Sequence, residues 1–152
     1  MSDTTTSQQL VVFSLGAEEY ALPIAAVSEI IRFSEPRSVA SEVAWIRGVI
    51  GLRGKIIPIF DLAARLELPA GTDGEPGKIV ILETGTDQVG VMVDEVEEVL
   101  TVEADQLEPV PTANTDTIEA IAKIDDRLVI LLNREGLFAS TPSADELAAA
   151  AA

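Results

Sequence analysis

The chain has 152 residues, of which 47% are apolar and only 4% aromatic, so its core must be built from Val, Ile, Leu and Ala. It contains neither Cys nor His, which excludes disulfides, thiol catalysis, zinc sites with thiolate or imidazole ligands, and every catalytic triad with His as its base. Acidic residues outnumber basic ones 26 to 10 and give a net charge of −16. We expect neither nucleic acid nor an anionic membrane as a partner, because the few basic residues are scattered along the chain.

The first half of the chain is predicted to consist of β-strands joined by tight turns. The strands are expected at 9–15, 20–24, 28–33, 49–52 and 55–60, with a short helical corner at 25–27. Gly16 starts the first turn, and Arg53-Gly54 closes a hairpin in which the glycine supplies a positive φ. Asp61 is expected to cap one or two turns of helix at 62–66.

The second half repeats this pattern. Residues 80–100 align without a gap with 11–31, and 118–138 align with 46–66, at offsets of 69 and 72. Strands are therefore expected at 78–83, 88–93, 97–102, 120–124 and 128–132. Asn133 takes the capping position of Asp61. The period is too long for a solenoid and indicates one duplication into two similar lobes.

Several short strands with regular turns predict an all-β fold of two small barrels. We expect lobe one at about 9–68, a Gly- and Pro-rich linker at 69–77, and lobe two at about 78–140. A barrel of roughly 65 residues is only marginally stable alone, so the lobes are expected to share a buried interface. The pattern leaves open whether they exchange strands. Residues 141–152 are expected to form a short helix or a frayed tail.

The charged and glycine-rich groupings do not predict catalysis. The acidic run at 94–98 is interpreted as a solvated face, because it has no glycine turn to converge its carboxylates on a cation. Asp125-Asp126 is interpreted as an exposed hairpin tip rather than a proton-sharing pair. The glycine-rich stretch 48–54 lacks the Lys and the strand–loop–helix context of a phosphate loop. We therefore expect no enzyme activity, no cofactor and no metal.

Two residues carry alternative interpretations. Arg53 is either a solvated turn residue or an exposed recognition residue, since Arg is enriched among interface anchors. Trp45, the only tryptophan, is expected to pack in the core, with contact to a partner as the alternative.

Three stretches of the chain carry a family resemblance. Residues 13–31, with Leu22-Pro23-Ile24, residues 45–62, with Leu52-Arg53-Gly54, and residues 89–100, with Val91-Met92-Val93, resemble the CheW family of chemotaxis coupling proteins. The likeness runs from about residue 9 to 138. It implies two five-stranded barrels and a domain spanning 9–140. It also implies a non-enzymatic adaptor between the cytoplasmic tips of methyl-accepting chemoreceptors and the regulatory domain of the histidine kinase CheA.

The resemblance also implies site residues and a location. In the family, receptor tips dock near the groove between the lobes, and the matching positions here are Val27, Glu29, Gly48, Arg53 and Val99. No kinase-contact residue is predicted. The polar N-terminal sequence has no signal-peptide features, and we expect a cytoplasmic protein recruited to membrane-associated receptor arrays.

Other interpretations remain open. The same adaptor role in an array that controls pili or gliding is one alternative. A generic small-barrel peptide-binding module is another, although one Trp and one Tyr are few aromatic residues for a peptide groove. A carboxylate-dependent enzyme would need two acidic residues in one pocket, and no spacing supports that. The acidic composition also favours a source that lives in concentrated salt, where self-repulsion is screened.

Overall fold

The computed structural model of the chain describes residues 7–38, 45–66, 77–84, 87–109 and 117–137. The elements of the first half are β1 (Ser7–Leu15), β2 (Glu18–Pro23), the 3-10 turn η2 (Ile24–Ala26), β3 (Val27–Arg32), β4 (Ile46–Leu52), β5 (Lys55–Asp61) and α1 (Leu62–Arg65). Those of the second half are β6 (Lys78–Thr84), β7 (Asp87–Val93), β8 (Glu95–Glu103), the 3-10 turn η3 (Ala104–Gln106), β9 (Leu107–Pro109), β10 (Ile118–Ile124), β11 (Arg127–Leu132) and α2 (Arg134–Leu137). The all-β prediction is confirmed.

Local sequence signals account for most element boundaries. Asp61 accepts a hydrogen bond from the backbone N–H of Ala64 at 3.2 Å, and Asn133 accepts one from the backbone N–H of Gly136 at 3.3 Å, so both predicted helix caps form.

Some elements differ from the prediction. The helical corner is η2, which begins one residue earlier than predicted. The three-residue strand β9 was not predicted, since so short a strand has no readable alternation. The tail at 141–152, and all of the linker at 69–77 except Gly77, lie outside the described residues.

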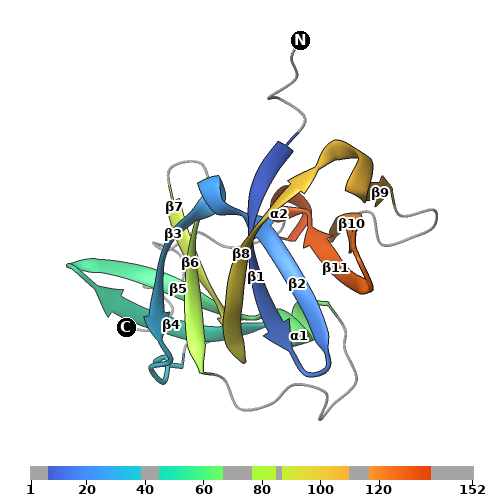
Figure 1. Cartoon of the computed structure of the whole chain (residues 1–152). Coiled ribbons are helices and arrows are strands. Elements are labelled where there is room, and N and C mark those ends of the chain that lie inside the picture. Colours follow the sequence, from blue (N-terminus) through green and yellow to red (C-terminus); the bar gives the residue numbers. More distant parts are fainter. Residues whose placement is uncertain (1–6, 39–44, 67–76, 85–86, 110–116, 138–152) are drawn as a thin grey trace.

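The strands form two sheets, and neither sheet comes from one half of the chain. Sheet A has the order β8-β1-β2-β11-β10-β9, and sheet B has the order β3-β6-β7-β5-β4. The first hairpin of each half is completed by later strands of the other half: β1 pairs with β8 and β2 with β11, whereas β6 pairs with β3 and β7 with β5. In Figure 1, sheet B occupies the left of the molecule and sheet A the right.

This exchange answers the question that the sequence pattern left open, whether the two lobes exchange strands. Residues 9–68 and 78–140 do not each build a sheet of their own, because β3 leaves the hairpin β1–β2 at the η2 corner and pairs with β6 instead. The equivalent strand β8 leaves β6–β7 and pairs with β1. The two halves are therefore interlocked rather than placed side by side.

The exchanged pairings keep the same register in both sheets. Glu29 lies opposite Ile81 in sheet B, and the repeat-related residue Glu98 lies opposite Val12 in sheet A. The parallel pairs show the same relation, with Ile59 opposite Gly90 and Leu131 opposite Ala21. The internal repeat thus extends from the sequence to the pairing of strands.

Three apolar clusters fill the fold. The first lies between the two sheets, where the aromatic rings of Phe13, Tyr20 and Phe60 pack with aliphatic residues of both halves and with Leu62 and Leu137 of the two helices. A second cluster lies within sheet A, and a third within sheet B. The predicted shared interface is therefore present, and it contains the largest side chains of the core. Closure of each sheet into a barrel remains a prediction.

A polar contact also ties the two halves together. Arg65 of α1 donates hydrogen bonds to the backbone carbonyls of Gly136 and Leu137 in α2, each at 2.9 Å. Its guanidinium lies 4.8 Å from the centre of the Trp45 ring. Trp45 is partly buried against the shared core, as its core interpretation predicts. Its indole nitrogen is buried and has no hydrogen-bond partner among the residues that the structure describes.

Candidate partner-binding surface

The five residues proposed from the resemblance fall on two sheets. Val27 and Glu29 lie on β3, Gly48 lies on β4, and Arg53 lies at the tip between β4 and β5, all in sheet B. Val99 lies on β8 of sheet A. The structure thus gathers four of them on one sheet and sets Val99 on the other.

Glu29 and Arg53 are in direct contact. The guanidinium of Arg53 donates to Glu29 Oε1 and forms an ion pair with it. The Arg53 side chain is 72% exposed, and that of Glu29 is 25% exposed. The hydrogen bond and the negative charge of Glu29 raise the pKa of Arg53. Arg53 is thus exposed, as both interpretations of it expect, and its charge is already paired within the protein.

Arg53 owes its position to a strained turn. Its backbone φ is 53°, in the left-handed region, and Gly54 follows with a φ of 80°. Asp125, which the offset of 72 relates to Arg53, has the same conformation with a φ of 54°. Both hairpin tips are exposed, and the predicted hairpins at both sites are confirmed.

Gly48 has a structural role that the sequence did not reveal. It is buried, its φ is 153°, and a Cβ atom there would lie 2.1 Å from the carbonyl oxygen of Arg37. Arg37 pairs with Val49 through two backbone hydrogen bonds of 2.8 and 2.9 Å. Gly48 therefore lets the segment after β3 approach β4, and it offers no side chain to a partner.

The two valines differ in exposure. Val27 is partly buried and packs against the shared core, as does its repeat counterpart Val96. Val99 is 50% exposed, and its counterpart Ile30 is 39% exposed. The exposed pair is better placed than Val27 to contact another protein.

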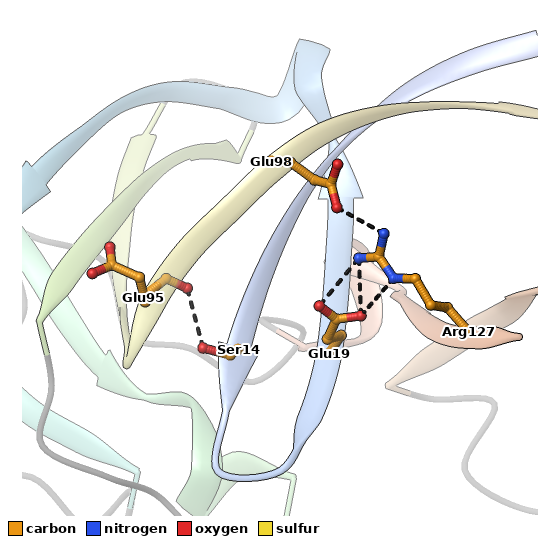
Figure 2. Close-up of polar contacts among 5 residues, drawn as sticks. All are labelled: Ser14, Glu19, Glu95, Glu98 and Arg127. Atoms are coloured by element: carbon orange, nitrogen blue, oxygen red, sulfur yellow. Dashed lines mark hydrogen bonds and ion pairs between the residues drawn. The ribbon is translucent and has the colours of Figure 1, made fainter. Parts of the chain in front are cut away.

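A second charged cluster, which the sequence analysis missed, lies on sheet A. Arg127 of β11 donates to both carboxylate oxygens of Glu19 at 3.0 and 3.1 Å, and to Glu98 of β8 at 2.7 Å. Figure 2 shows the guanidinium between the two carboxylates. These charge-assisted hydrogen bonds raise the pKa of Arg127. The signal in the sequence was the alignment of Glu98 with Glu29. Glu29 pairs with Arg53 of the β4–β5 hairpin, and Glu98 pairs with Arg127 of the β10–β11 hairpin.

Two further exposed apolar side chains repeat between the sheets. Ile56 on β5 is 46% exposed, and Leu128, its counterpart on β11, is 59% exposed. Each directly follows a basic residue, Lys55 or Arg127. Exposed apolar groups beside charged ones are typical of protein–protein contact surfaces.

The acidic run at 94–98 lies at the surface, and several of its carboxylates are paired with groups of the protein. Asp94 accepts a hydrogen bond from the backbone of Gly16 at 2.8 Å, and Glu95 pairs with Lys78 at 2.9 Å. The described residues contain no group of acidic side chains placed to hold a metal ion. Nor do they include a helix with the length and apolar content needed to cross a membrane.

Comparison with known proteins decides the family. The family model described as CheW-like domain matches residues 9–141. The chain belongs to the CheW family. The match covers both sheets and all the residues discussed above.

Relatives of this CheW-family chain agree with that assignment. It is 32% identical to the chemotaxis protein CheW of Klebsiella aerogenes over 92% of this chain and 87% of that protein. It is 32% identical to a probable chemotaxis protein CheW of Rhizobium etli, over 90% of each chain. The crystal structure of the scaffolding protein TtCheW from Thermoanaerobacter tengcongensis superposes with a TM-score of 0.80 at 34% identity, covering 88% of this chain and 94% of that one.

Proposed function

We propose that this chain is a non-enzymatic adaptor that couples methyl-accepting chemoreceptors to the histidine kinase CheA in chemotaxis. It binds the regulatory domain of the kinase and the cytoplasmic tips of the receptors, and works in the cytoplasm at membrane-associated arrays. The observation that carries the proposal is the likeness of almost the whole chain to chemotaxis relatives and to a scaffolding protein of the same fold.

The surface chemistry supports a binding role. The exposed apolar residues Ile30, Ile56, Val99 and Leu128 recur at related positions of the two sheets. The ion pair of Glu29 with Arg53 offers directed hydrogen bonds on sheet B, which also carries Ile30 and Ile56. Such a combination suits recognition, since Arg and exposed aliphatic groups are common at interface centres.

The receptor site is proposed at Val27, Glu29, Gly48, Arg53 and Val99, with different roles. Arg53 and Glu29 contact the partner directly, and Val99 adds apolar contact area. Gly48 and Val27 act by shaping β4 and the shared core, because one is buried and the other partly buried.

A second candidate function rests on a weaker likeness. The chain is 25% identical to the protein PilI of Pseudomonas aeruginosa over 55% of this chain and 47% of that protein. This match favours an adaptor in an array that controls pili. The chemotaxis relatives match more of the chain at higher identity, so the chemotaxis role is preferred.

The proposal is tested by titrating the full chain with the kinase regulatory domain from the same cell in a calorimeter. We expect saturable one-to-one binding at about micromolar affinity or tighter. No heat at any salt concentration, with the protein folded, would contradict the adaptor function.

The Glu29–Arg53 pair is tested by reversing its charges. Arg53→Glu should weaken receptor binding about tenfold or more, because it removes a donor and sets two carboxylates together. The double variant Arg53→Glu with Glu29→Arg restores an ion pair of opposite direction. If recognition depends on Arg53 itself, the double variant recovers stability but not binding. Recovery of both would show that the pair only supports the fold.

A further inference from the structure

The basic residues of this acidic chain are concentrated in one region. Six of the ten lie between residues 27 and 66, which hold four acidic residues and therefore have a net charge of +2. The other 112 residues carry four basic and 22 acidic residues, a net charge of −18. The six are Arg32, Arg37, Arg47, Arg53, Lys55 and Arg65.

This segment contributes neighbouring strands of sheet B. β4 pairs with β5, and the chain beyond β3 pairs with β4 through the bridge between Arg37 and Val49. Arg47 and Arg53 are held in ion pairs, and Arg65 donates to backbone carbonyls of α2. The exposed side chains of Arg37 and Lys55 have no ion pair among the described residues. A partner that approaches these two side chains meets positive charge on a chain whose net charge is −16.

An open pocket lies in this region. It has a volume of about 470 Å³ and is lined by Ser34, Glu35, Arg37, Val49, Ile50, Gly51 and Ile56. Its apolar wall includes Ile56, which is 46% exposed. A Cβ atom added at Gly51 would have no atom of the described residues within 4 Å, apart from its two chain neighbours. The pocket is thus large enough for one or two apolar side chains from outside.

Arg37 gives the pocket its charge. It is exposed and forms no ion pair with any residue that the structure describes, although its backbone is fixed by the bridge to Val49. Glu35 also lines the pocket, but Arg47 lies 3.9 Å from its carboxylate and offsets its charge. An unpaired guanidinium beside exposed aliphatic groups is suited to a carboxylate that arrives with an apolar neighbour.

We propose that this pocket receives an acidic segment of the receptor tip, with an apolar side chain against Ile56 and Gly51 and an Asp or Glu paired with Arg37. The assignment rests on the proposed adaptor function. The receptor rather than the kinase is chosen because the pocket lies on β4 between Gly48 and Arg53, two positions already proposed for the receptor site. The pocket assignment goes beyond the adaptor function because it specifies a negatively charged receptor segment and the pocket that its apolar side chain enters.

The test uses the full chain, a soluble fragment of a chemoreceptor tip and the kinase regulatory domain, each titrated separately. Arg37→Glu should weaken receptor binding about tenfold and flatten its dependence on salt, because a charge pair at the rim is lost. Gly51→Leu should weaken it as much by filling the pocket, without a clash inside the protein. Lys123→Glu makes the same change of net charge on sheet A and should leave receptor affinity within about twofold.

The outcomes separate the two proposals. If the unmodified chain binds neither probe, the adaptor function itself fails. If it binds the receptor fragment, and Arg37→Glu and Gly51→Leu fold normally by circular dichroism and bind as tightly as before, the pocket assignment is wrong. The assignment is also wrong if these variants lose binding to the kinase domain alone, because the kinase domain would then be the occupant. It is wrong as well if Lys123→Glu weakens receptor binding as much as Arg37→Glu does.

Discussion

Arg127 of β11 donates a hydrogen bond of 2.7 Å to Glu98 of β8, although β1 and β2 separate these two strands in sheet A. In a flat sheet, strands three places apart would lie about 14 Å from each other. The long side chains of Arg127 and Glu98 span this distance across β1 and β2, and Glu19 of β2 lies between them. In sheet B, Arg53 reaches Glu29 on β3 in a related way.

Removing Arg127 tests this relationship. Arg127→Ala should lower the free energy of unfolding by about 1 kcal/mol, because one partly buried guanidinium serves two carboxylates that then repel each other. Lys123→Ala is the matched control, since Lys123 makes a single exposed pair with Glu108, and its effect should stay within about 0.5 kcal/mol. Urea unfolding measures both. Equal effects would mean that the Arg127 cluster adds nothing beyond an ordinary surface pair.

Gly48 and Gly51 form a second matched pair on the same strand. Gly48→Ala should destabilise the fold by about 2 kcal/mol or more, because its Cβ would meet the Arg37 carbonyl oxygen at 2.1 Å and its φ of 153° suits only glycine. Gly51→Ala places its Cβ in open space and should change stability by less than about 0.5 kcal/mol. Thermal unfolding compares the two. A neutral Gly48→Ala would contradict the close approach of the Arg37 segment to β4.

Tyr20 gives a prediction about pH. It is the only tyrosine, and burial, followed by the negative charge of Glu18, raises its pKa above the ordinary value of 10.0. Because the folded-state pKa is the higher one, the stabilisation is fully present below pH 10 and is lost as pH rises through the folded pKa. Absorbance at 295 nm should show tyrosinate forming at higher pH in the folded protein than in denaturant. Identical curves would contradict the burial of the phenol.

Much of the fold could be predicted from local sequence signals, but the partners of the strands could not. Alternation and turn residues placed most strands, and Asp61 and Asn133 marked the helix caps. Alternation reports which face of a strand is buried, not which strand lies beside it. The internal repeat adds to the ambiguity of strand pairing, because β1 and β6 have similar patterns and either could pair with β3 or β8. The observed choice depends on the η2 corner and the equivalent bend at Asp94, which redirect the chain.

The candidate surface was predictable only in part. Arg53 was singled out by its glycine-flanked turn, but its partner Glu29 is 24 residues away, and no local pattern joins them. The role of Gly48 depends on the backbone of Arg37, and the pocket depends on a bridge between segments that sequence periodicity does not relate. Arg127 was missed because the alignment at the offset of 72 sets it against Lys55 rather than against Arg53.

The net charge of −16 predicts a strong effect of salt. The midpoint of unfolding should rise as KCl is increased toward molar concentrations, because the Debye length falls from about 10 Å at 0.1 M to about 3 Å at 1 M and self-repulsion in the compact state is screened. Choline chloride at equal ionic strength separates screening from a specific effect of potassium. An unfolding midpoint indifferent to both salts would remove the case for a protein adapted to concentrated salt.

The adaptor function requires that one chain hold two partners at once. The most direct test measures the fraction of the kinase that sediments with receptor-bearing membranes in the presence and absence of this protein. We expect the kinase to sediment only when the chain is added, and Arg53→Glu to reduce the sedimenting fraction. A kinase that sediments equally without the chain, or stays in the supernatant at every ratio of chain to kinase, would contradict the coupling role.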